Sequence, residues 1–170
     1  LTLLFSLPLQ AAEPAISQIR KEYQAIRDTL PTLRKQEIEL SGYSADGGAA
    51  TAYRDGKNNI RLLRVELYGE SGKEFEEYYY RNGMLIFAFY ESHQYNVPYY
   101  VTEETAKDAG GVAFDPKKTV VTEGRYYFDK GKMIRWLNEE KKEVGISTKE
   151  FKDAEIGILK FSNELLDKFK

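Results

Sequence analysis

The chain has 170 residues, of which 42% are hydrophobic and 31% are charged. This length suits one domain that buries a core without disulfides, and this composition excludes a disordered chain. The formal net charge is -2 and no basic block stands out, so the sequence predicts no nucleic-acid binding.

The first residues, LTLLFSLPLQAAEP, form a short apolar run followed by small residues. This pattern is typical of the apolar segment and cleavage zone of a secretory signal peptide. We therefore expect a signal-peptide remnant over residues 1–12, a single domain over residues 13–170, and a location in a bacterial periplasm or outside the cell. The alternative is a buried N-terminal strand or helical turn. Such a run is too short to cross a bilayer, and we expect no integral membrane segment.

The chain contains no cysteine. This excludes disulfides, thiol catalysis and cysteine-ligated metal centres within these residues, and we expect no lipoprotein anchor. The 13 tyrosines exceed the 9 phenylalanines. Because tyrosine suits a position with one wet end and an apolar body, this excess predicts a half-exposed β surface.

A helix is expected from Pro14, since proline is tolerated in a first helical turn, to Pro31, which ends or kinks it. Its apolar residues recur at spacings of three and four: Ile16, Ile19, Tyr23, Ile26 and Leu30. Strands are then expected over residues 33–43, 49–53, 60–68, 73–80 and 84–91.

An irregular stretch, 92–118, is expected to hold a short helix near 103–109. A second hairpin follows, with strands at 120–128 and 132–138. The last element is a helix over 147–170, which begins with a capping box formed by Ser147 and Glu150.

The clearest hairpin is EEYYYRNGMLIFAFYE, because Asn-Gly is the strongest short-range turn signal. A two-residue turn at Asn82-Gly83 pairs Tyr80 with Leu85 and Tyr79 with Ile86. The segment EGRYYFDKGKMIRWLNE repeats this pattern, and TAYRDGKNNIRLL is a more degenerate copy. The sequence therefore predicts one hairpin unit repeated in a meander.

These segments resemble a group of exported bacterial proteins of uncharacterised function. The similar elements are SADGGAATAY, YGESGKEFEEYYYRNGMLIFAF, YNVP and RYYFDKGKMIRWL, in that order over roughly residues 41–138. The Tyr-x-Asn-Gly hairpins are weakly similar to MORN repeats, although the glycine-rich consensus of MORN repeats is not met. The resemblance implies export and an antiparallel sheet, and it implies no catalytic residues.

The expected fold is α+β: an antiparallel meander of about six to seven strands, with N-terminal and C-terminal helices packed on the sheet. If both helices cover one face, the other face is open. Aromatic side chains would make such a face a binding site for a protein, peptide or glycan. The candidate residues are Tyr79, Tyr90, Tyr127, Trp136, Tyr95 and His93. The alternatives are core packing alone, which the sequence favours, and a homodimer through that face.

No catalytic motif, cofactor fingerprint or metal-ligand spacing is present, so we expect a non-enzymatic module without cofactor or metal. The alternative is a cell-envelope hydrolase. It would use a pair of the many carboxylates and His93, the only histidine, which lies beside Glu91.

Overall fold

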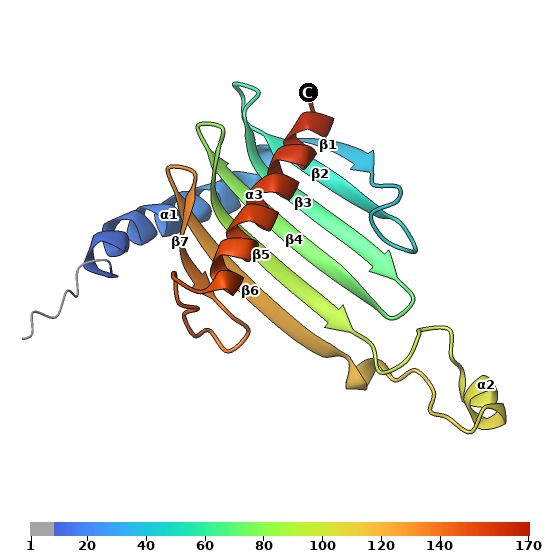
Figure 1. Ribbon diagram of the computed structural model, residues 1–170. Coiled ribbons are helices and arrows are strands. Elements are labelled where there is room, and N and C mark those ends of the chain that lie inside the picture. The colour runs from blue at the N-terminus through green and yellow to red at the C-terminus, as the bar shows by residue number, and fades with distance from the viewer. Residues whose placement is uncertain (1–8) are drawn as a thin grey trace, which may run out of the picture.

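Seven strands pair in chain order into one antiparallel sheet in this computed structural model, which describes residues 9–170 (Figure 1). The strands are β1 (Arg34–Glu39), β2 (Gly48–Arg54), β3 (Ile60–Gly69), β4 (Gly72–Arg81), β5 (Met84–Gln94), β6 (Val120–Asp129) and β7 (Lys132–Leu137). The helices are α1 (Leu9–Thr29), α2 (Glu103–Asp108) and α3 (Lys149–Lys168), with short 3-10 turns at Leu30–Thr32 and Pro116–Lys118. The predicted α+β meander is confirmed.

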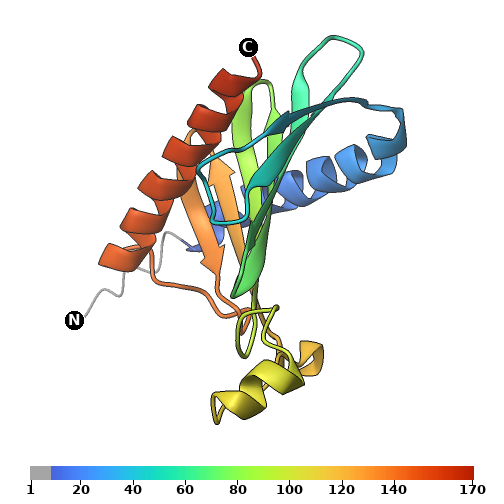
Figure 2. The same cartoon turned by 90° about the vertical axis from the view of Figure 1, so that its right-hand side faces the viewer.

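The two long helices lie on opposite faces of the sheet, as the edge-on view in Figure 2 shows. The stripe of α1 buries Ile16, Ile19 and Ile26 against one face. Its partners on the sheet are Tyr53, Leu62, Tyr79, Ile86, Phe87 and Tyr127. Each helix has one apolar face, so one helix per sheet face is enough to bury both sides of the central strands.

Helix α3 covers the other face and buries Phe151, Leu165 and Phe169. These side chains join a cluster on the sheet that includes Leu40, Ala50, Ala52, Leu63, Val65, Tyr78, Tyr80, Leu85, Ala88, Phe128 and Met133. One buried polar contact crosses this layer, since the Tyr80 hydroxyl and Ser162 Oγ lie 2.7 Å apart. At the end of α3, Arg54 donates to the Phe169 carbonyl at 2.7 Å, where a cation also complements the helix dipole.

The hairpin pattern that repeats in the sequence also repeats in the structure, including an irregularity in strand pairing. The register shifts by one residue close to the turn in β2–β3, in β4–β5 and in β6–β7. Each shift leaves one extra residue on the second strand, and these residues are Arg61, Ile86 and Ile134. All three lie on the α1 side of the sheet. The bulges therefore give each hairpin an additional side chain directed at α1.

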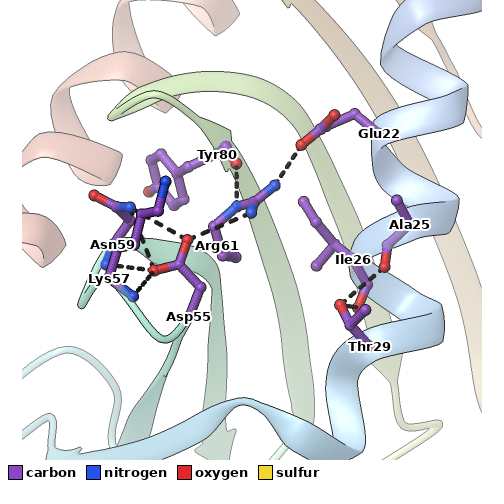
Figure 3. Close-up of polar contacts among 9 residues, drawn as sticks. All are labelled: Glu22, Ala25, Ile26, Thr29, Asp55, Lys57, Asn59, Arg61 and Tyr80. Atoms are coloured by element: carbon purple, nitrogen blue, oxygen red, sulfur yellow. Dashed lines mark hydrogen bonds and ion pairs between the residues drawn. The ribbon is translucent and has the colours of Figure 1, made fainter.

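Arg61 shows what this bulge achieves at the first hairpin (Figure 3). Its guanidinium binds Glu22 of α1, contacts Asp55 at 3.5 Å and donates to the Tyr80 carbonyl at 3.4 Å. Asp55 in turn accepts the backbone N–H groups of Lys57 and Asn59 and so fixes the β2–β3 turn. One arginine thus joins the turn, the sheet and the helix.

The bulge also corrects the predicted register of the central hairpin. Tyr80 pairs with Leu85 as expected, but Tyr79 pairs with Phe87 rather than Ile86. A two-residue turn and strict alternation predict no extra residue, so every pair beyond Tyr80 is displaced by one. Tyr79 and Ile86 remain on the α1 face, whereas Tyr90 turns to the α3 face.

The helix ends also differ from the predictions. Helix α1 begins at Leu9 and carries Pro14 inside it, so it runs through the expected boundary between residues 12 and 13. The first eight residues of the expected remnant lie outside the described residues. Helix α3 is capped by Thr148, whose side chain accepts the Phe151 N–H, and not by the predicted box of Ser147 and Glu150.

The chain between β5 and β6 leaves the sheet and carries α2 away from the two layers (Figures 1 and 2). Asn96 holds this segment together, because its side chain donates to the Ala113 carbonyl and accepts the Asp115 N–H. Tyr95 packs edge-on against Phe114, with ring centroids 5.1 Å apart. The short helix predicted near 103–109 is confirmed.

Candidate binding groove

A groove with a volume of about 610 Å³ lies on the α1 side of the sheet, between the helix and the central strands. We call it the arginine groove. Its lining residues are Ile19, Arg20, Tyr23, Arg27, Arg64, Val65, Glu66, Phe75, Glu76, Glu77, Phe87, Phe89, Glu91, Arg125 and Tyr127. Ligand sites of small molecules and peptides have volumes in this range and combine apolar walls with a few placed polar groups.

The strand register brings the charged residues of the groove together. Arg64 pairs with Glu77, Glu77 with Phe89, and Phe89 with Arg125 across β3, β4, β5 and β6. Residues that pair directly across antiparallel strands point to the same face, so these four form one row on the floor. The next row on the same face contains Glu66, Phe75, Glu91 and Glu123.

Glu77 is the centre of a structural cluster. Its Oε1 accepts from Arg64 Nε at 2.8 Å and from Arg27 Nη1 at 3.2 Å, and its other oxygen accepts from the Tyr79 hydroxyl. Burial, together with the neighbouring carboxylate of Glu77, raises the pKa of Tyr79. Because two arginines share one carboxylate, the cluster joins α1 to the sheet and retains an excess of positive charge.

Arg125 occupies the side of the groove opposite Arg64. Its guanidinium lies over the Phe89 ring, 5.2 Å from the ring centroid, and its Nη2 donates to Glu123 at 2.6 Å. Its Nη1 is buried and has no hydrogen-bond partner among the described residues. A buried donor without a partner costs about 1–3 kcal/mol, so a ligand acceptor at this position would be favoured.

The other end of the groove is acidic. Glu91 Oε1 lies 2.5 Å from His93 Nε2, and the His93 ring packs edge-on against Phe75 with centroids 5.5 Å apart. Glu66 accepts a hydrogen bond from the Tyr68 hydroxyl at 2.5 Å. The groove therefore has an arginine-rich end beside α1 and a carboxylate end farther along the strands.

The predicted site residues do not form one site. Tyr79 is fully buried and Tyr127 is 7% exposed, both under α1, so the expectation of an open face around these two tyrosines is wrong. Tyr90 and Trp136 lie on the α3 side, and Tyr95 packs in the segment after β5. The physical reason is that each sheet face is covered by one of the two long helices. This arrangement supports the alternative of core packing for Tyr79 and Tyr127.

The arginines and phenylalanines of the groove were not identified from the sequence as candidate site residues. A signal was present, since Arg64 lies between the apolar Leu63 and Val65 inside the expected strand 60–68, and Arg125 lies beside Tyr126 inside 120–128. Charged residues in the middle of a strand that is covered on both faces need partners. The identity of those partners depends on register, which the bulges displace.

Within the described residues, no group of three or more His, Asp or Glu side chains is arranged to hold a metal ion. No helix in this part of the chain is both long and apolar enough to cross a membrane. Comparison of the chain with protein-family models, curated proteins and solved structures gave no match.

Proposed function

We propose that this protein is a non-enzymatic binding module that holds an organic carboxylate with an aromatic or apolar body in the arginine groove. A peptide that ends in an aromatic residue and a free carboxylate has this chemistry. The observation that carries the proposal is Arg125, whose guanidinium is fixed by Phe89 and Glu123 and has a buried donor that finds no partner among residues 9–170. A carboxylate accepts from arginine in a charge-assisted and often bidentate geometry.

Three features of the groove support this ligand class. Phe75, Phe87 and Phe89 provide aromatic surface for an apolar body. Arg20 is exposed on α1 at the rim and adds positive charge that favours the approach of an anion. Arg27 of α1 forms an ion pair with Glu77 of β4 and holds the helix in place, so the groove is formed before the ligand arrives.

The test is a titration of the ¹⁵N-labelled full chain with N-acetylphenylalanine, followed by NMR, with N-acetylphenylalanine amide as the uncharged comparison. We expect the carboxylate to shift amide signals along β5 and β6 and the amide form to bind more weakly by about tenfold. Arg125→Gln and Arg20→Gln should both weaken binding of the carboxylate. The control Arg81→Gln makes the same change on the same sheet outside the groove and should have no effect.

Equal binding of the acid and its amide would contradict a carboxylate ligand. Binding of a neutral oligosaccharide such as chitotriose, with no response to the peptide acid, would replace the proposed ligand with a glycan. Circular dichroism of each variant shows whether a loss of binding reflects a loss of the fold.

The alternative of a hydrolase would use Glu91 and His93, which lie 2.5 Å apart at the acidic end of the groove. A general base needs a nucleophile or a water within reach. Among the described residues, His93 makes its side-chain hydrogen bond to Glu91 alone. We therefore propose binding rather than hydrolysis. Turnover of a chromogenic ester or glycoside that is abolished by His93→Ala would reverse this preference.

We also propose that the protein is exported, on the strength of the signal-like residues 1–12 and the resemblance to exported bacterial proteins. Immunodetection in fractionated cells of the natural source tests this. Recovery in the cytosolic fraction alone would contradict it.

A further inference from the structure

A second hollow, of about 210 Å³, lies on the opposite face of β4 and β5, beside α3. We call it the tyrosine pocket. It is lined by Glu76, Tyr78, Ala88, Phe89, Tyr90, Tyr126, Gly157, Ile158 and Phe161. It faces α3 rather than α1, so its interpretation does not depend on the function proposed for the arginine groove.

Glu76, the carboxylate that lines this pocket, has no cationic partner in the part of the chain that the structure describes. Glu76 accepts a hydrogen bond from the Tyr78 hydroxyl, and Glu74 on the same face accepts from the Tyr90 hydroxyl at 2.9 Å. No Lys, Arg or His side chain of the described residues forms an ion pair with either carboxylate. By contrast, Glu77 on the other face has two arginine partners. Burial, with a smaller contribution from Glu74, raises the pKa of Glu76, which is the response of a carboxyl without a cation.

The walls of the pocket are aromatic. Tyr126 stacks on Trp136 with centroids 5.4 Å apart, and its ring extends over Gly124, where a side chain would collide with it. Tyr78 packs against Phe161 with centroids 6.1 Å apart. The faces of such rings carry partial negative charge and attract ammonium groups.

The rim of the pocket contains a glycine in the middle of α3. Gly157 costs this helix about 1 kcal/mol relative to alanine, although a Cβ at this position would meet no atom within 4 Å. Neither helix packing nor backbone conformation therefore requires a glycine. Its small size leaves the rim beside Ile158 open.

We propose that the tyrosine pocket binds an organic ammonium group, with Glu76 as the counter-charge and the tyrosine rings as walls. A carboxylate and aromatic side chains in the lining both favour a cation over a neutral molecule of the same shape. Hard metal ions are a poorer match, because they require several oxygen ligands. The open rim at Gly157 gives the ligand a path past α3.

The direct test is a titration of the ¹⁵N-labelled full chain with choline, with butylammonium as a primary amine, and with the neutral isostere of choline in which carbon replaces nitrogen. Because choline is small, we expect a Kd on the order of 1 mM. Amide signals of Ala88 and Ile158 should shift in a saturable way. The neutral isostere should bind about tenfold more weakly or not at all. Equal binding of the isostere, or no saturable shift with either amine, would overturn the proposal.

Two variants, each with a matched control, locate the site. Glu76→Gln keeps the size of the side chain and an acceptor for Tyr78, and it should weaken choline binding about tenfold or more. Glu91→Gln makes the same change on the opposite face and should leave the affinity unchanged. Gly157→Leu adds bulk at the rim and should block binding, whereas Gly157→Ala should not. Unchanged choline affinity in Glu76→Gln or in Gly157→Leu would refute the assignment of this pocket.

Discussion

Gly124 provides the sharpest test of the packing on the α3 face. A Cβ built at this residue would lie 2.6 Å from the Tyr126 hydroxyl oxygen and 2.9 Å from ring atom Cε2. The ring has little freedom to retreat, because it stacks on Trp136. Gly124→Ala is therefore an overpacking substitution, which costs typically about 1–3 kcal/mol. For a chain of this size, about 2 kcal/mol corresponds to a decrease in Tm of about 4–8 °C.

The assay is urea unfolding followed by far-UV circular dichroism, with Gly124→Ala measured in the natural background and in a Tyr126→Leu background. If the clash with the ring causes the loss, the alanine should cost much less once the ring is gone, so the double-mutant cycle shows coupling of about 1 kcal/mol or more. Gly56→Ala is the control, since its Cβ meets no atom within 4 Å. The same cost of Gly124→Ala in both backgrounds would refute the reasoning.

Three further predictions concern buried polar groups. Tyr80→Phe removes the contact with Ser162 Oγ and should lower the free energy of unfolding by about 1 kcal/mol, with no further loss on adding Ser162→Ala. Glu76→Gln should raise the Tm at pH 7, because burial raises the pKa of the Glu76 carboxyl above its unfolded value of 4.5. The contribution of this carboxyl to stability is complete below the unfolded pKa and is lost as pH rises through the folded pKa, so the ionised group opposes folding at pH 7. An unchanged or lower Tm would contradict this. Burial also raises the pKa of Tyr90 to about 12 from 10.0. The contribution of this hydroxyl to the free energy of unfolding is therefore complete below pH 10 and is lost as pH rises toward 12. Tyr90→Phe should reduce the alkaline loss of stability in a pH series of urea titrations, and an identical pH profile would count against this prediction.

The sequence was sufficient for the elements of this fold because the signals are local. The apolar stripe of α1 and the Asn-Gly turn at Asn82 and Gly83 each depend on residues close in the chain. Strands that are neighbours in sequence also pair in a meander, so the order of the strands followed from the hairpins.

The location of the candidate site did not follow from the sequence, for two physical reasons. A bulge adds one residue to a strand without a clear sequence signature, and in β5 it exchanged the faces of the residues from Phe87 onward relative to the predicted register. The choice of sheet face for each helix depends on long-range packing, which buried Tyr79 and Tyr127 and left the arginine groove open beside α1. The resemblance to exported proteins gave no information on either point.

The order of the elements along the chain has a consequence for folding during synthesis. Helix α1 precedes the seven strands and α3 follows them, so α3 leaves the ribosome after the meander, which is complete while one of its faces has no cover. Until α3 arrives, buried rings such as Tyr80 and Phe128 meet water. We predict that a chain ending at residue 146 keeps its strands but binds the dye ANS and aggregates, and that a separate peptide of residues 147–170 suppresses both. A truncated chain that unfolds cooperatively without binding ANS would show that the sheet does not need α3 to bury its core.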